Sequence, residues 1–99
     1  MVFKIIIKPL AVSDIDKAIG WYEKRSIGLG KRFYLSVEES IYKIAASPSA
    51  YFSITKEVRR ILLQNFPYKL FYTFSADTIY IIGVLHVKRS KAFVRRRIS

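Results

Sequence analysis

The chain has 99 residues, of which 52% are hydrophobic and none is cysteine, and its formal net charge is +11. This length supports one hydrophobic core and therefore a single domain over residues 1–99, and the lack of cysteine excludes disulfides, thiolate zinc sites and thiol catalysis. No stretch is long and apolar enough for a membrane span or a secretory signal, so we expect a cytoplasmic protein without membrane association.

The first half of the sequence predicts a strand followed by two helices. Residues 2–8 are rich in β-branched side chains and end at Pro9, which is typical of a strand. Ser13 predicts the start of a helix that ends near Ser26, and a glycine-containing turn leads to a second helix over residues 31–46. Both helices carry an apolar stripe at helical spacing, formed by Ile15, Ala18, Ile19 and Tyr22 in the first and by Phe33, Val37, Ile41 and Ile44 in the second.

The second half predicts three strands, over residues 58–63, 69–75 and 78–86. The last of them alternates apolar residues on both faces, with Ile79, Ile81, Gly83 and Leu85 on one, so we expect it in the interior of the sheet. Residues 88–98 predict a short C-terminal helix or tail that opens at Ser90 and is anchored by Phe93, Val94 and Ile98.

This order of elements, β-α-α-β-β-β, indicates an α+β domain. We expect an antiparallel helical hairpin on one face of a small, largely antiparallel four-stranded sheet, with the N-terminal strand at an edge or in the centre. The other face is then free to carry the basic side chains of the last three strands.

Positive charge is concentrated toward the C-terminus. Residues 51–99 hold ten Lys or Arg against two acids, and residues 85–99 hold six basic residues and no acid. Charge of this density indicates an anionic partner, which is a nucleic acid, an acidic protein or the acidic surface of a larger complex.

Most enzymatic readings fail on residue types. There is no phosphate-binding glycine loop, and one histidine without cysteine cannot build a metal site, so we expect no metal and no cofactor. A metal-free ribonuclease remains open, with His86 as base or acid and Arg60, Lys69 and Arg89 holding phosphate. In the alternative interpretation these are solvated charges, and His86 is hydrogen-bonded to the backbone. Stacking of bases on Tyr68, Tyr72 and Tyr80 is disfavoured, because such aromatics are more often core residues.

The chain resembles the RelE/ParE superfamily of toxins from type II toxin–antitoxin systems, which are known for plasmid stabilisation, and within it the ParE branch. The resemblance covers nearly the whole chain, in order, and rests on Asp14-Ile15, Ala18, Trp21-Tyr22, Gly28-Leu29-Gly30, Phe33, Pro48, Arg59-Arg60, Phe66-Pro67-Tyr68, Tyr72, His86 and Arg89. It implies a helical hairpin on a small sheet, and a cognate acidic antitoxin that wraps the toxin in a hetero-oligomer.

The resemblance leaves two targets. RelE-like members cleave mRNA on the ribosome, whereas ParE-like members poison DNA gyrase and are not known as nucleases. Lys69 stands where the ribonucleases often carry arginine, and Phe93 and Val87 stand where they carry tyrosine and another arginine. Since Phe93 has no hydroxyl, gyrase inhibition without enzymatic activity is favoured. After Arg89 the chain departs from the acid and proline that are common in the family.

The alternatives are a ribosome-dependent mRNA endonuclease, with Arg60, Lys69, His86 and Arg89 as its catalytic residues, and a non-toxic binding protein. In every case we expect the target or the antitoxin to contact basic residues of the sheet and tail, namely Arg59, Arg60, Lys69, His86, Arg89, Arg95, Arg96 and Arg97.

Overall fold

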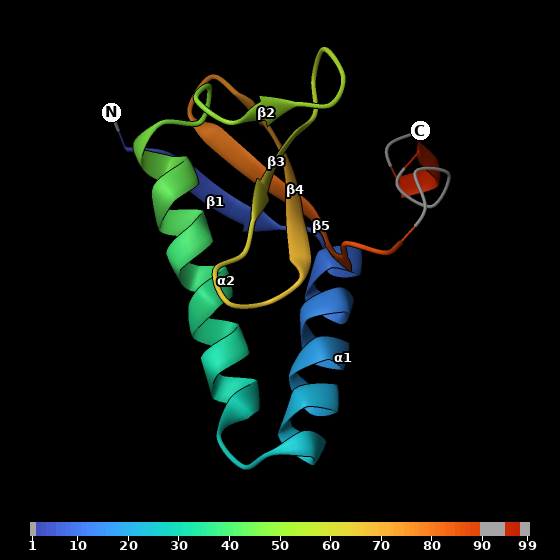
Figure 1. Cartoon of the computed structure of the whole chain (residues 1–99). Helices are drawn as coiled ribbons and strands as arrows, with labels where there is room; N and C mark the ends of the chain where they lie inside the picture. The colour runs from blue at the N-terminus through green and yellow to red at the C-terminus, as the bar shows by residue number, and fades with distance from the viewer. Residues whose placement is uncertain (1, 90–94, 98–99) are drawn as a thin grey trace.

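The computed structural model describes residues 2–89 and 95–97. The elements in chain order are β1 Lys4–Ile7, α1 Pro9–Arg25, α2 Leu29–Ala46, β2 Phe52–Ser53, β3 Arg59–Leu62, β4 Tyr68–Ser75 and β5 Thr78–His86. Figure 1 shows the two helices side by side as a hairpin, with the strands lying across the part of the hairpin away from its connecting turn. No helix in the described part of the chain is long and apolar enough to cross a membrane.

The strands form one mixed sheet in the order β1-β5-β4-β3-β2. β1 runs parallel to β5, and the other neighbours are antiparallel. The predicted α+β class and the interior position of the last strand are therefore confirmed. The sheet has five strands where four were predicted, because β2 is a two-residue strand that pairs with the start of β3.

The first helix begins at Pro9, so the predicted start at Ser13 is wrong. Lys8 is extended, with φ −64° and ψ 152°, as the residue before a proline prefers. Proline suits the first helical turn because its missing N–H would have no partner inside the helix. The predicted end is confirmed, since Ser26 caps α1 through its backbone N–H.

The core lies between the helical hairpin and one face of the sheet. Most of the predicted stripes are buried there, and Ile19, Tyr22 and Ile41 are half-buried at its margin. The buried residues are Ala11, Ile15 and Ala18 of α1, Phe33, Val37 and Ile44 of α2, and Ile61, Leu63, Leu70, Tyr72, Ile79, Ile81 and Val84 of the sheet and its connections.

The strict alternation predicted along the last strand is wrong beyond Ile81. Tyr72 pairs with Ile81 and Phe71 with Gly83, so one extra residue of β5 bulges out of the ladder. A bulge reverses which side chains face inward. Ile79, Ile81 and Val84 consequently share the main core, whereas Leu85 packs on the opposite face.

The end of the chain is described only at residues 95–97, which form a helical turn. The predicted helix start at Ser90 and the anchors Phe93, Val94 and Ile98 lie outside the described residues.

Candidate partner-binding site

The face of the sheet opposite the hairpin holds a pocket of about 510 Å³, which we call the sheet-face pocket. Basic and apolar side chains line it together, and none of the described residues of the lining carries a carboxylate. Its lining consists of Phe52, Ile54, Thr55, Arg60, Lys69, Phe71, Leu85, His86, Val87, Arg89 and Arg95. The structure thus brings together five of the eight predicted site residues.

Strand register arranges part of this lining in a row. Phe52 is opposite Arg60, Arg60 is opposite Phe71, and Phe71 is opposite Gly83. Side chains directly opposite on neighbouring strands share a face, so the row crosses the outer face from β2 to β5. The guanidinium carbon of Arg60 lies 4.6 Å from the centre of the Phe52 ring, a cation–π contact that directs Arg60.

Phe71 and Leu85 form the floor of the pocket and belong to a second, smaller hydrophobic cluster. Val58, Phe71 and Leu85 are each at most 5% exposed, and Ile82 packs against them. The outer face was predicted to carry the basic side chains of the last three strands, and it also has an apolar floor, because the bulge in β5 turns Leu85 toward it. Lys69, directly opposite Leu85 in the ladder, stands beside this apolar floor.

His86 is held by its neighbours at the end of β5. Its Nδ1 accepts a hydrogen bond from the Lys88 backbone N–H at 3.1 Å, and its ring packs edge-on against Tyr68 with centres 5.3 Å apart. The neutral imidazole therefore carries its proton on Nε2, where it is a donor. Neither ring nitrogen then offers a free lone pair to remove a proton from a substrate.

Tyr68 belongs to the hairpin side of the sheet. Its ring packs edge-on against Phe33, with centres 4.9 Å apart. Burial raises the pKa of its hydroxyl, and the nearby Arg89 charge and a hydrogen bond with Tyr22 partly oppose that shift. Tyr68 is thus a packing residue with a protonated phenol, and its ring is used in the core and not offered to a nucleic-acid base.

Arg59 lies outside the sheet-face pocket. Its Nη1 donates to the Tyr51 carbonyl at 2.7 Å, and the residue is opposite Tyr72 in the ladder. Burial raises the pKa of the Tyr72 hydroxyl to about 12, with the Arg59 charge opposing. That hydroxyl donates to the Pro48 carbonyl at 2.6 Å. Arg59 therefore supports the loop between α2 and β2.

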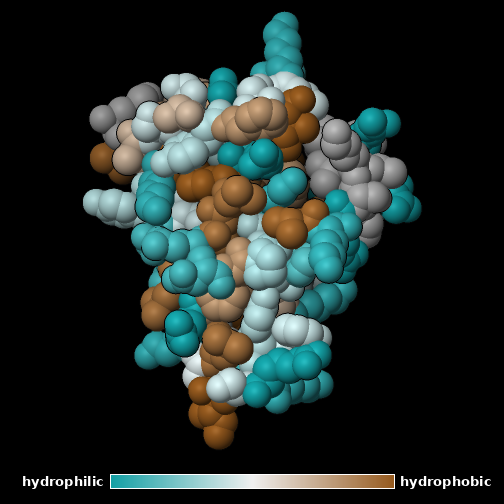
Figure 2. Space-filling view, viewed as in Figure 1, coloured by the Kyte–Doolittle hydropathy of each residue, from teal (hydrophilic) through white to brown (hydrophobic). Residues whose placement is uncertain are grey.

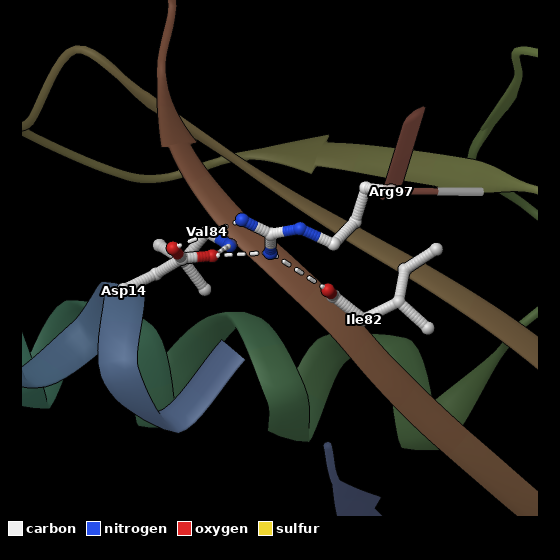
Figure 3. A network of polar contacts seen from close by, with 4 residues as sticks. All are labelled: Asp14, Ile82, Val84 and Arg97. Atoms are coloured by element: carbon white, nitrogen blue, oxygen red, sulfur yellow. Dashed lines mark hydrogen bonds and ion pairs between the residues drawn. The ribbon is translucent and has the colours of Figure 1, made fainter. Parts of the chain in front are cut away.

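Arg97 is also engaged within the molecule (Figure 3). Its Nη1 donates to Asp14 Oδ2 at 2.8 Å and to the Ile82 carbonyl at 3.1 Å, and its Nη2 donates to Asp14 Oδ1 at 3.3 Å. Asp14 Oδ2 also accepts from the Val84 N–H at 3.0 Å. This network, which we call the tail clamp, ties α1, the end of β5 and the C-terminal turn together.

The tail clamp supplies hydrogen-bond partners to backbone groups of β5 that no strand reaches. β1 covers β5 only as far as Ile81, and the Lys8 N–H makes the last backbone bond, to the Ile81 carbonyl at 2.9 Å. Beyond it, the Ile82 carbonyl and the Val84 N–H would lack strand partners. The Arg97 side chain donates to the Ile82 carbonyl instead, and the Asp14 side chain accepts from the Val84 N–H. The sequence names Asp14 only among the residues that carry the family resemblance, and the spacing of Asp14 from Arg97 carries no local signal.

The remaining predicted residues differ in position. Arg95 lines the sheet-face pocket, two residues before the clamped Arg97, and Arg96 is exposed. Within the described residues, no group of three or more His, Asp or Glu side chains could hold a metal.

A second groove of about 560 Å³ runs along α1 and meets the first pocket at Leu85, His86 and Arg89. Trp21 lies in it, 51% exposed, with the guanidinium carbon of Arg25 4.1 Å from the centre of its ring. The motif tryptophan is therefore a surface residue, held by its own helix.

Solved structures of known toxins share this fold. The chain is similar to a chain in the structure of the chromosomal ParDE TA system from P. aeruginosa, with 15% identity, 86% of this chain and 96% of that chain covered, and a TM-score of 0.64. It is also similar to the isolated E. coli RelE toxin, with 17% identity, 98% and 99% covered, and a TM-score of 0.60. A RelE double mutant in complex with an antitoxin peptide matches at 17% identity, with 97% and 95% covered and a TM-score of 0.61.

Sequence comparison gives the family. None of the curated proteins matches the chain. Residues 5–91 match the model of the ParE toxin of the type II toxin–antitoxin system parDE. Because this match spans most of the chain, the protein belongs to the ParE toxin family of the RelE/ParE superfamily.

Proposed function

We propose that this toxin inhibits DNA gyrase by binding it, and that it does not cleave RNA. The observation that supports the proposal is the hydrogen bonding of His86, whose Nδ1 accepts from the Lys88 backbone N–H beside a pocket whose described lining residues include no carboxylate. ParE-like toxins, which the chain resembles, poison gyrase without nuclease activity. A binding surface needs charge and shape but no general base.

Metal-free RNA cleavage needs a group that takes the proton of the ribose 2′-hydroxyl. Arg60, Lys69 and Arg89 are cations suited to holding phosphate, not to removing protons. Protonation of His86 at Nδ1 would bring its N–H against the Lys88 N–H and break their hydrogen bond. His86 is therefore poorly arranged as either base or cationic acid.

A toxin of a type II toxin–antitoxin system has a cognate antitoxin. The net charge of +11 suits an acidic one, and charge complementarity would speed their association. The related RelE toxin in complex with an antitoxin peptide supports a hetero-oligomer as the inactive form.

One observation favours a second function. Arg60, Lys69, His86 and Arg89, the four residues expected of a RelE-like mRNA endonuclease, line one pocket. For this function, binding of RNA would have to break the hydrogen bond between the Lys88 N–H and His86 Nδ1 so that His86 could reorient.

The test uses purified toxin in two assays. We expect loss of gyrase supercoiling and accumulation of cleaved DNA complexes, reversed by the antitoxin. Primer extension on mRNA translated with the toxin should show no new 5′ ends. Unchanged supercoiling would refute the proposal, and new 5′ ends that vanish in His86→Ala would establish the endonuclease instead. A host that grows normally during expression of the toxin alone would indicate a non-toxic binding protein.

A further inference from the structure

The turn that joins α1 and α2 carries an apolar side chain in contact with water, at the end of the molecule away from the strands (Figure 1). Ile27 of this turn is 96% exposed, and Trp21, near the end of α1, is 51% exposed. Figure 2 shows hydrophobic surface beside hydrophilic surface at this end of the molecule. One exposed apolar side chain is common on proteins, so its surroundings decide what it can bind.

The surroundings of Ile27 are basic. Residues 21–32, which we call the hairpin tip, contain one acid, Glu23, and four exposed cations, namely Lys24, Arg25, Lys31 and Arg32. Four cations against one acid give the tip a net charge of +3. The Glu23 carboxylate accepts from the Gly28 and Gly30 backbone N–H groups, each at 3.0 Å, so it faces the start of α2. The ion pairs within the described part of the chain use none of the four cations.

Indole, cations and aliphatic side chain follow one another toward the end of the tip. Trp21, Lys24 and Arg25 share one side of α1, because helix positions three and four apart are neighbours. The guanidinium carbon of Arg25 lies 4.1 Å from the centre of the Trp21 ring. At about 1.5 Å per residue, the end of α1 at Arg25 is about 6 Å beyond Trp21 along the helix axis. Ile27 comes after this end and is therefore farther from the strands than the indole.

The surface of an anionic lipid bilayer suits all three kinds of group. Its headgroup phosphates attract Lys and Arg, an indole is stable at the headgroup level, and aliphatic side chains enter the acyl boundary about 5–10 Å deep. That depth is comparable with the length of the tip beyond Trp21. A nucleic acid would engage the cations through its phosphates, but it could cover Ile27 only by unstacking base pairs. A fluid lipid surface receives a projecting side chain without a preformed cavity.

We propose that the hairpin tip docks on an anionic lipid bilayer. Ile27 inserts among the acyl chains, Trp21 lies at the headgroup level, and the four cations of the tip contact headgroup phosphates. We expected no membrane association from the lack of a long apolar stretch, but that lack bears on spanning a bilayer and not on binding its surface. This docking goes beyond the proposed function, because it uses no residue of the sheet-face pocket.

The test uses the full-length toxin, in which Trp21 is the single tryptophan and therefore the fluorescent probe. Vesicles of equal parts phosphatidylglycerol and phosphatidylcholine present an anionic surface, and vesicles of phosphatidylcholine alone do not. We expect the toxin to sediment with the anionic vesicles and the Trp21 emission to shift to shorter wavelength. The zwitterionic vesicles should bind it at least about tenfold more weakly, because they do not attract the four cations.

Two pairs of variants separate insertion and charge at the tip from general effects. Ile27→Ser should weaken binding to the anionic vesicles about tenfold, because the inserted side chain is lost. Its control Val2→Ser removes a side chain that is 92% exposed near the N-terminus, away from the tip in Figure 1, and should leave binding nearly unchanged. Lys24→Gln should weaken binding about fivefold, and more than Lys56→Gln, which removes the same charge from an exposed loop. All four side chains are exposed, so each variant should keep the circular dichroism spectrum of the wild type.

Binding that ignores the tip would overturn the proposal. Such results are equal binding to the two kinds of vesicle, no saturable binding to the anionic ones, or equal losses in Ile27→Ser and Val2→Ser. Equal losses in Lys24→Gln and Lys56→Gln would show attraction by net charge alone and would also overturn it. A duplex oligonucleotide that shifts the Trp21 emission more than the anionic vesicles do would assign the tip to nucleic acid instead. Gyrase is absent from these measurements, so their failure is distinct from failure of the proposed function.

Discussion

The tail clamp can be broken by substituting either Asp14 or Arg97, and the effects of the two substitutions on stability should not be additive. Asp14→Ala deletes the acceptor shared by Arg97 and the Val84 N–H, and Arg97→Ala deletes the cation. Asp14→Asn keeps an oxygen for the Val84 N–H but removes the charge. These three variants and the double alanine variant separate the ion pair from the backbone cap.

The expected loss follows from burial. A surface ion pair contributes about 0–1 kcal/mol, and breaking a fully buried pair costs about 3–5 kcal/mol. With side chains 14% and 11% exposed, the Asp14–Arg97 pair lies between these limits. The Val84 N–H left without an acceptor adds about 1–3 kcal/mol. We therefore expect Asp14→Ala to lower the free energy of unfolding by about 2–4 kcal/mol and Asp14→Asn by about half as much.

Urea unfolding followed by circular dichroism measures these differences. In the double-mutant cycle, Asp14→Ala should cost about 1–2 kcal/mol less when Arg97 is already alanine, because contacting residues couple. A coupling energy below about 0.3 kcal/mol would refute the reasoning, since the pair would then contribute no interaction. Equal losses in Asp14→Ala and Asp14→Asn would refute the role given to the Val84 amide.

Three further predictions concern the hairpin and the core. Gly30→Ala should destabilise the protein by about 1–3 kcal/mol in thermal melts, since its added Cβ would lie 2.8 Å from the Ile19 carbonyl oxygen. Gly20→Ala, whose Cβ would meet nothing within 4 Å, should stabilise it by about 0.5–1 kcal/mol. A Gly30→Ala variant more stable than Gly20→Ala would contradict this. Glu23→Gln should lower the free energy of unfolding by about 0.5–1 kcal/mol, because Glu23 accepts hydrogen bonds from the Gly28 and Gly30 amides at the start of α2. The control Glu39→Gln should lower it less, because Glu39 pairs with an exposed lysine on the helix surface. Tyr72→Phe should lose about 1 kcal/mol at neutral pH. Folding favours the neutral form of Tyr72, whose pKa is raised to about 12, so wild-type stability falls as pH rises from 10 toward 12. The difference in unfolding free energy between the wild type and Tyr72→Phe should therefore narrow over this range in urea titrations. A difference that stays constant with pH would contradict the buried, hydrogen-bonded position of this hydroxyl.

The hairpin and the last three strands were predictable because their signals are local. Helical spacing of apolar residues marks the buried side of each helix whatever it packs against, and Phe33, Val37 and Ile44 were found in this way. Strands of eight and nine residues with dense β-branched and aromatic side chains are equally explicit.

The missed features depend on residues distant in the sequence. β2 is two residues long and exists because Phe52 and Ser53 meet Arg60 and Arg59. The bulge in β5 reflects how β4 pairs with it, so no alternation rule applied to β5 alone could locate it. The partnership of Asp14 with Arg97 spans 83 positions and requires the whole fold.

The basic residues illustrate why a charge count predicts a partner better than it predicts a site. By sequence, Arg59, Arg60, Arg95 and Arg97 are equivalent contributors to one positive surface. In the structure, Arg59 supports the Tyr51 carbonyl and Arg97 completes the edge of β5, whereas Arg60 and Arg95 line the pocket. Arginines with internal acceptors act on binding through the shape of the surface. Those on the pocket contribute charge to it directly, so the two groups should separate in any experiment that measures stability and partner affinity together.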